Sequence, residues 1–147
     1  MAVVNYHGIL TTLKELLEAD DSLHGVPVLV EEEPVFDLLG AGKALVLTLD
    51  SRRETSGQPL AAGKRTRWHI RLGIWAAGFD LKFEEAAKKR DDLVGALELV
   101  LMNNRTVQGL VGAGWIEGGV FIPVQSAQGM YALAETVMVL EATAVAT

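Results

Sequence analysis

The sequence contains no cysteine, and this absence excludes several kinds of function at once. Disulfide frameworks, thiolate catalysis, cysteine-ligated zinc and iron–sulfur clusters all require that residue. Long apolar runs are missing too, since the most apolar stretch, residues 130–147, contains Glu135 and Glu141 and predicts no membrane span. The N-terminus has neither the basic start nor the apolar core of a secretory signal, so none is expected.

Positive charge is in the minority, with 13 Lys and Arg against 19 Asp and Glu and a net charge of −6. Bulk acidity argues against non-specific nucleic-acid binding by the whole surface. The 147 residues are 50% apolar and 22% charged, which predicts one folded domain spanning residues 1–147. The mean hydropathy is positive, which favours a subunit whose apolar surface meets another subunit.

The glycine clusters do not form a nucleotide site. Residues 40–43 look like the end of a phosphate loop, but Asp37 and Ala44 stand where that loop needs a glycine and a Ser or Thr. Residues 112–118 miss the dinucleotide-binding spacing by one position and lead into a strand, not a helix. The sequence therefore predicts no bound cofactor.

The remaining chemistry-bearing residues are scattered. His7, His24 and His69 stand far apart, without the spacing that places two metal ligands on one helix, so no metal site is predicted. Ser126 has no flanking glycines of a nucleophile elbow. We expect no catalytic residues and no enzyme activity, although carboxylates distant in sequence can meet in a fold.

Hydrophobic periodicity predicts two helices and five strands. The helices are expected at residues 7–19 and 80–104, and the strands at residues 26–30, 43–49, 68–78, 115–122 and 130–142. Asp80 is expected to cap the second helix, and Gly118 and Gly119 to form a turn or bulge. This order predicts an α+β fold, in which a mostly antiparallel sheet of about five strands packs with two helices.

A long polar loop is expected over residues 50–66, between the second and third strands, because no helix or strand period survives there. Such loops are uncommon in compact domains unless they are functional. Six of the 13 positive charges fall within twenty residues, and Glu54 is the one acid among them. These six are Arg52, Arg53, Lys64, Arg65, Arg67 and Arg71.

Three interpretations of the basic loop stay open. It can dock on the acidic surface of a neighbouring copy, reach a polyanion such as DNA, or form a solvated hairpin tip. Inside the loop, over residues 50–66, no aromatic residue interleaves with the basic residues, which disfavours a stacking site for single-stranded nucleic acid. The last strand carries apolar residues on both faces, and an uncovered edge of that kind would pair with another chain. We expect subunit or partner contacts from Arg52, Arg53, Lys64, Arg65 and Arg67.

The order of elements resembles the tail terminator (tail-completion) proteins of long-tailed bacteriophages, the group that includes the lambda tail terminator and related minor tail proteins. The resemblance covers nearly the whole chain. It rests on the first helix with Leu16-Leu17-Glu18, the polar loop, the strand from residue 68 to 75, the helix from 83 to 101, and the segments 118–123 and 131–139.

The resemblance implies a structural subunit that forms a hexameric ring on the head-proximal end of the tail tube. That ring would end tube polymerisation and offer the surface to which the filled head attaches. Its partners would be copies of itself, the tail tube protein and a head–tail connector or neck protein, with DNA passing through the ring. The subunit would be assembled in the host cytoplasm and reside in the virion. The alternatives are a connector or neck component and a small ligand-binding α+β domain.

Overall fold

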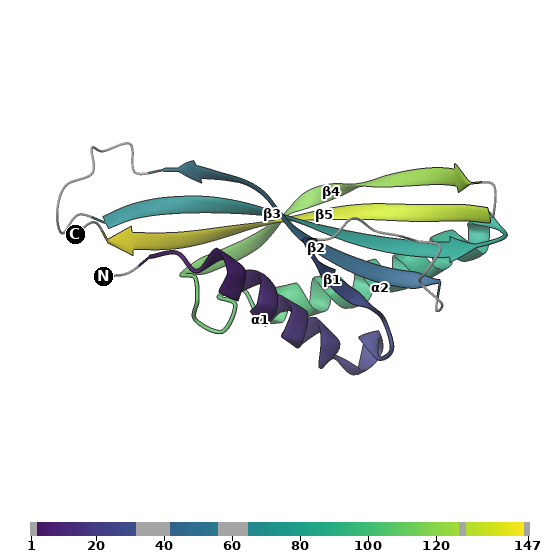
Figure 1. Cartoon of the computed structure of the whole chain (residues 1–147), viewed down its shortest axis with the longest axis horizontal. Helices are drawn as coiled ribbons and strands as arrows, with labels where there is room; N and C mark the ends of the chain where they lie inside the picture. Colours follow the sequence, from purple (N-terminus) through teal and green to yellow (C-terminus); the bar gives the residue numbers. More distant parts are fainter. Residues whose placement is uncertain (1–2, 32–41, 56–64, 127–128, 146–147) are drawn as a thin grey trace.

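The structure is a computed structural model, and it describes residues 3–31, 42–55, 65–126 and 129–145. The helices are α1 (Tyr6–Glu18) and α2 (Phe83–Asn103), and a short 3₁₀ helix, η1 (Asp21–Leu23), follows α1. The strands are β1 (Val28–Val30), β2 (Lys43–Glu54), β3 (Arg65–Asp80), β4 (Ala113–Ser126) and β5 (Gly129–Val145) (Figure 1).

The strands form one five-stranded sheet in the order β1-β2-β3-β5-β4. β1 pairs parallel to β2, whereas the other three pairs are antiparallel. The predicted α+β fold, a mostly antiparallel sheet with two helices, is therefore confirmed.

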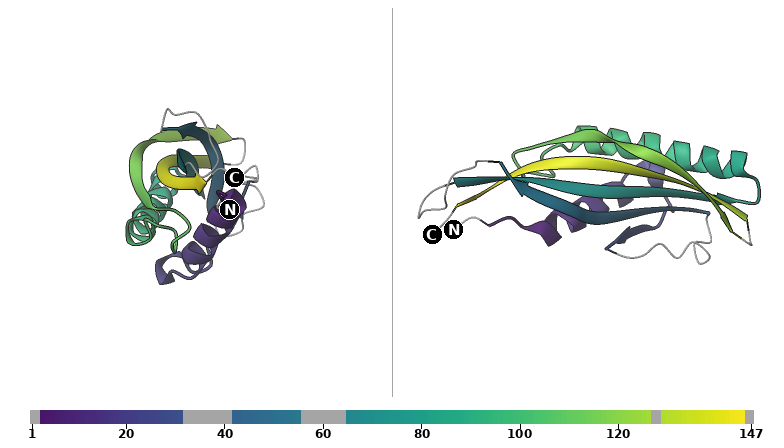
Figure 2. Two further views of the ribbon diagram at one scale, coloured as in Figure 1. Left: turned by 90° about the vertical axis from the view of Figure 1, so that its left-hand side faces the viewer. Right: turned by 90° about the horizontal axis from the view of Figure 1, so that it is seen from above.

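Both helices pack on the same face of the sheet (Figure 2). The buried stripe of each helix repeats at the helical period, and the strand residues that belong to this core alternate, because these are the spacings that keep side chains on one face. The stripes are Ile9, Leu13 and Leu17 on α1 and Leu93, Leu97 and Val100 on α2; they meet Leu45 and Leu47 of β2, Ile70, Leu72 and Ile74 of β3, and Met138 and Leu140 of β5. Each such side chain contributes roughly 1.5–3 kcal/mol by burial.

The predicted loop over residues 50–66 is wrong at both ends, because β2 continues to Glu54 and β3 begins at Arg65. Residues 56–64 lie outside the described part of the chain. Here the sheet extends past α2 and beyond the first turn of α1 (Figure 1), and residues 50–53 are exposed on both faces. Because residues 50–53 have no buried face, apolar and polar residues do not alternate there in the sequence. We call this extension of the sheet the arm; it comprises residues 50–54, 65–69 and 141–145.

The prediction that the last strand is an uncovered edge is wrong for most of its length and holds only for residues 142–145. β5 lies between β3 and β4 and is paired with both from Gly129 to Glu141, and beyond Glu141 it pairs with β3 alone. Apolar residues on both faces are equally typical of an internal strand. The free edges of the described sheet belong to β4 and the end of β5 beyond Glu141 on one side, and to β1 and the uncovered part of β2 on the other.

The turn from β3 into α2 differs from the expected one. β3 does not end at Gly78 but continues to Asp80, and Gly78 is the residue over which α2 crosses the sheet. A Cβ at Gly78 would collide with the carbonyl oxygen of Ala86. The N-cap of α2 is Lys82, and Asp80 instead accepts a hydrogen bond from the Lys82 N–H at 3.3 Å.

Candidate assembly surfaces

The arm brings together four of the five predicted contact residues. Arg52 and Arg53 lie on β2, and Arg65 and Arg67 lie on the adjacent antiparallel strand β3. All four side chains are exposed. Lys64 falls outside the described residues. Their role in contacts between proteins stays a prediction.

A β-bulge decides which of these arginines face the helices. The register of β2 against β3 shifts between Leu49 and Ser51, which leaves Asp50 as an extra residue. Beyond the bulge, Arg52 lies opposite Ile70 and shares the face that the helices cover. Its neighbour Arg53 points to the opposite face, which we call the outer face, because successive residues of a strand alternate.

Arg52 is fixed to the rest of the protein. We call this part, which comprises α1, α2 and the sheet outside the arm, the body. Its Nη1 donates to the Tyr6 hydroxyl at 3.4 Å, and its guanidinium carbon lies 5.8 Å from the Tyr6 ring centroid and 5.2 Å from that of Trp68. These are cation–π distances. A recess of about 470 Å³ adjoins this cluster, lined in part by Leu49 and Ile70. Arg52 therefore joins the arm to α1, a contact that sequence patterning could not reveal.

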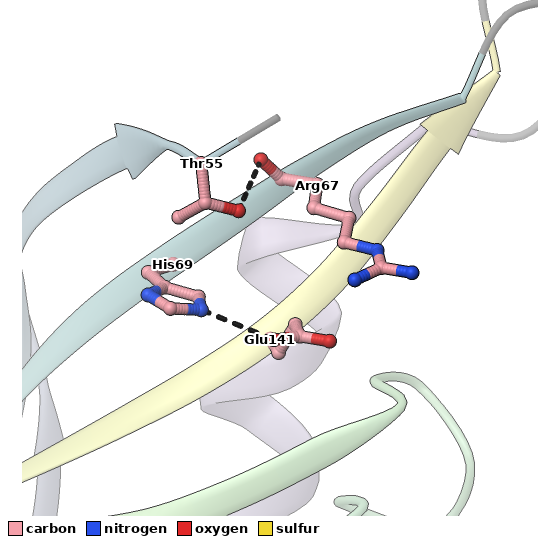
Figure 3. A network of polar contacts seen from close by, with 4 residues as sticks. All are labelled: Thr55, Arg67, His69 and Glu141. Atoms are coloured by element: carbon pink, nitrogen blue, oxygen red, sulfur yellow. Dashed lines mark hydrogen bonds and ion pairs between the residues drawn. The ribbon is translucent and has the colours of Figure 1, made fainter. Parts of the chain in front are cut away.

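The other three arginines are available for contacts on the outer face. No salt bridge between described residues involves Arg53, Arg65 or Arg67. In Figure 3 it is the backbone carbonyl of Arg67 that is engaged, accepting from the Thr55 hydroxyl at 3.4 Å and from the Thr55 N–H at 2.9 Å. The arm thus presents three guanidiniums without a carboxylate partner in the described chain.

The acid nearest to these arginines on β5 already has a partner. His69 Nε2 and Glu141 Oε2 lie 3.1 Å apart, across neighbouring positions of β3 and β5 (Figure 3). The His69 ring also meets the Trp115 ring edge-on, with centroids 5.3 Å apart. This cluster fixes the base of the arm against β4.

Arg71, the sixth residue of the basic cluster, is held between two bulges. Its Nη1 contacts Glu117 Oε2, and its Nε lies 3.9 Å from Asp50 Oδ2. Glu117 is the extra residue of a second bulge, in β4, which confirms the irregularity predicted at Gly118. Because bulges increase the local twist, these two re-aim the arm relative to the rest of the sheet.

The free edge of β4 is strongly apolar, and sequence reasoning missed it. Its four exposed apolar residues have exposed fractions between 37% and 63%: Val120, Phe121, Ile122 and Val124. Glu117, the single charged residue of β4, is already paired with Arg71. The apolar run was visible in the sequence, but its place at an edge depends on strand order, which no local pattern encodes.

Helix α2 runs beside this edge and exposes an acidic face. The Arg90 guanidinium carbon lies 4.8 Å from the centroid of the Phe121 ring, and its Nε lies 2.9 Å from Asp91 Oδ1. Four further exposed carboxylates of α2 form no salt bridge with a described residue: Glu84, Glu85, Asp92 and Glu98. This surface is opposite in charge to the arm.

The carboxylate of Asp80, at the end of β3 just before α2, has a lowered pKa. The Lys82 N–H and the Lys89 ammonium, which lies 3.2 Å from the carboxylate, hold the pKa of Asp80 below its ordinary value of 3.8. Lys89 Nζ also donates to the Phe79 carbonyl at 3.0 Å. These bonds fasten the end of β3 to the first turns of α2.

The described residues form neither a metal-binding cluster nor a membrane-spanning helix. No group of three or more His, Asp and Glu side chains converges there in a way that could hold a metal ion. None of the helices formed by these residues is long and apolar enough to cross a membrane.

Comparisons with known proteins give a likeness in fold. No protein-family model and no curated protein matches the sequence. Among solved structures, the chain is similar to the sheath/tube terminator of an extracellular contractile injection system, PVC, determined by cryo-EM in the extended state, with a TM-score of 0.52 and 11% sequence identity. The match covers 100% of this chain and 61% of that one, so this chain spans less than two thirds of the neighbour's length. At the level of the fold, this agrees with the resemblance to tail terminators seen in the sequence.

Proposed function

We propose that this protein is a structural subunit that ends the tube of a phage-type tail. The observation that carries the proposal is the likeness of the whole chain to a sheath/tube terminator. In this role the subunit assembles with copies of itself into a ring, six-membered by the resemblance to phage tail terminators, and caps the head-proximal end of the tail tube. It contacts the tube on one side and a connector or neck protein on the other, and it catalyses no reaction.

The exposed surfaces support such a role. A terminator must meet neighbouring copies and a tube, so it needs several contact surfaces around one small domain. The apolar edge of β4 and the unpaired arginines of the arm lie on different parts of the sheet. Monomeric proteins rarely leave long apolar edges uncovered, because such edges invite pairing with other chains.

The test is tube capping. Purified protein is added to the polymerising tube protein of the same particle, and tube lengths and ends are measured by electron microscopy. We expect shorter tubes with extra density at one end, in proportion to the protein added. Unchanged lengths with bare ends would contradict the terminator role, and binding to isolated head–neck particles instead would identify a connector component.

Ring size is a separate measurement. Averaged end-on views of capped tubes should show sixfold symmetry, and light scattering over a concentration series should show whether the ring forms before it meets a tube. A different symmetry would overturn the six-membered ring without affecting the capping role.

A further inference from the structure

The arm and the surface formed by α2 and β4 have opposite charge. The outer face of the arm carries Arg53, Arg65 and Arg67, and no salt bridge within the described chain neutralises them. The exposed side of α2 carries four carboxylates that are likewise outside any described salt bridge: Glu84, Glu85, Asp92 and Glu98. Lys88 is the one exposed cation of α2 that is not bound to a neighbouring group.

The acidic side of α2 borders the exposed apolar residues of the β4 edge. Glu98 and Val94 line one small recess of about 150 Å³ together with Val120 and Phe121 of the β4 edge. An apolar centre with a charged rim is the usual composition of a contact surface between proteins. We call this combined surface, α2 with the β4 edge, the acceptor surface.

Pro123 bears on how the acceptor surface is used. It lies within β4, opposite Ala132, and has no N–H to donate. Strands tolerate proline where the nitrogen faces a free edge, and there it interrupts the row of donors that an added strand would need. We therefore expect that side-chain contacts determine what binds there, and that a continuous ladder of backbone hydrogen bonds contributes less.

One copy cannot satisfy both surfaces by itself. The arm projects at one end of the long sheet, whereas α2 lies along the half of the sheet away from the arm (Figures 1 and 2). A contact between the arm of one copy and the acceptor surface of another leaves an arm and an acceptor surface free at the two ends of the pair. Such head-to-tail contacts continue until a ring closes.

We propose that the arm of each subunit docks on the acceptor surface of the next copy of this chain. Three arginines and four carboxylates that form no salt bridge within the described chain then meet each other, and the β4 edge is buried beneath them. A polyanion is a poorer partner for the acceptor surface, since its carboxylates would repel it. This inference rests on the proposed function for its biological setting, but its contacts are between copies and need no tube.

The test is a charge swap in two halves, with the molar mass measured by light scattering over a concentration series. The arm variant is Arg65→Glu with Arg67→Glu, and the acceptor variant is Asp92→Lys with Glu98→Lys. Each alone should raise the concentration of half-assembly by about tenfold or more, which corresponds to a loss of ~1.4 kcal/mol or more. Mixed in equal amounts, the two variants should assemble again, because each reversed surface then meets an oppositely charged partner.

Matched controls separate this contact from general charge effects. Lys14→Glu with Lys43→Glu changes the net charge as the arm variant does, and Glu15→Lys with Glu18→Lys as the acceptor variant does. All four residues lie outside the arm, α2 and β4 and outside every described salt bridge. Controls should assemble like the unchanged protein. Circular dichroism and thermal unfolding check that each variant is folded.

Three results would overturn the docking contact: assembly of the single variants at the unchanged concentration, failure of the mixture to assemble, or a protein that stays monomeric at every concentration and salt. Tube capping by the unchanged protein is scored separately. The capping role can therefore survive the loss of this contact, and the contact can survive the loss of the capping role.

Discussion

Strand β3 runs through both the body and the arm, and these two regions differ in burial and in charge. In the body, Ile70, Leu72 and Ile74 are buried to 1% exposure or less beneath the helices. In the arm, Arg65 and Arg67 of the same strand are exposed and without an ion-pair partner in the described chain. One hydrogen-bonded strand thus contributes to the stability of the fold along one part and presents charge along another. The length of a strand and the depth of the core beneath it are therefore separate properties of this sheet.

The largest expected difference between the two regions is in the effect of shortening a side chain on the free energy of unfolding. Leu72→Ala should lower the free energy of unfolding by about 2–5 kcal/mol, because it leaves a cavity under both helices. Arg67→Ala, five positions earlier in β3, should change it by less than about 0.5 kcal/mol. Urea unfolding followed by circular dichroism measures both. Equal losses would mean that the arm is part of the cooperative core.

A glycine pair tests the crossing of α2 over the sheet. Gly78→Ala should destabilise the fold by roughly 1–3 kcal/mol, because the new methyl group collides with the α2 backbone at Ala86. Gly95→Ala adds the same methyl group to α2 where no atom lies within 4 Å, and it should stabilise by about 1 kcal/mol through helix propensity. Thermal unfolding of both variants should therefore shift in opposite directions. Two shifts of the same sign would refute the close crossing.

The arginine that joins the two regions should have a smaller effect. Arg52→Ala removes the cation–π contacts with Tyr6 and Trp68 and should cost about 0.5–1 kcal/mol of stability. Arg53→Ala, on the outer face, serves as the matched control and should be near neutral. The change in Trp fluorescence on Arg52 substitution should report the lost contact with Trp68. An equal loss of stability in the two variants would contradict the assignment of the two faces.

The smallest effect concerns pH at the turn into α2. Because the folded pKa of Asp80 is lowered, its contribution to stability is present above its ordinary value of 3.8 and is lost as the pH falls through the folded pKa. The difference in unfolding free energy between the native protein and Asp80→Asn should therefore shrink as the pH falls below 3.8. Lys89→Met should weaken the same dependence. A constant difference between native protein and Asp80→Asn down to pH 2 would refute it.

The elements of the body could be predicted from sequence, because their buried residues repeat at the helical or strand period. The first helix was expected at residues 7–19 and lies at Tyr6–Glu18. The arm was missed, since Arg52 and Arg53 have no buried face to impose an alternation. Strand order was missed as well, because the apolar runs of β4 and β5 look alike and only pairing decides which is the edge.

The contact role of the basic residues stays a prediction, whereas their placement in the fold can be compared with the sequence. Arg53, Arg65 and Arg67 do gather on one face of the arm, as their clustering in the sequence indicated. Arg52 was separated from them by one extra residue, Asp50, and such a shift has no signature in composition. The acceptor surface was not predicted, because it joins residues from α2 and β4 that meet only in the folded chain.

The two bulges have a consequence for how the length of the chain can vary. Asp50 in β2 and Glu117 in β4 have no partner position of their own on the central strands β3 and β5. Removing either residue would leave the positions beyond it in register, so Arg52 would still face Tyr6, although Arg71 would lose an ion pair. β2 and β4 therefore each contain one residue that the strand pairing does not require. Single deletions at these two places should be far better tolerated than single insertions or deletions elsewhere in the sheet, which would turn every following side chain to the other face.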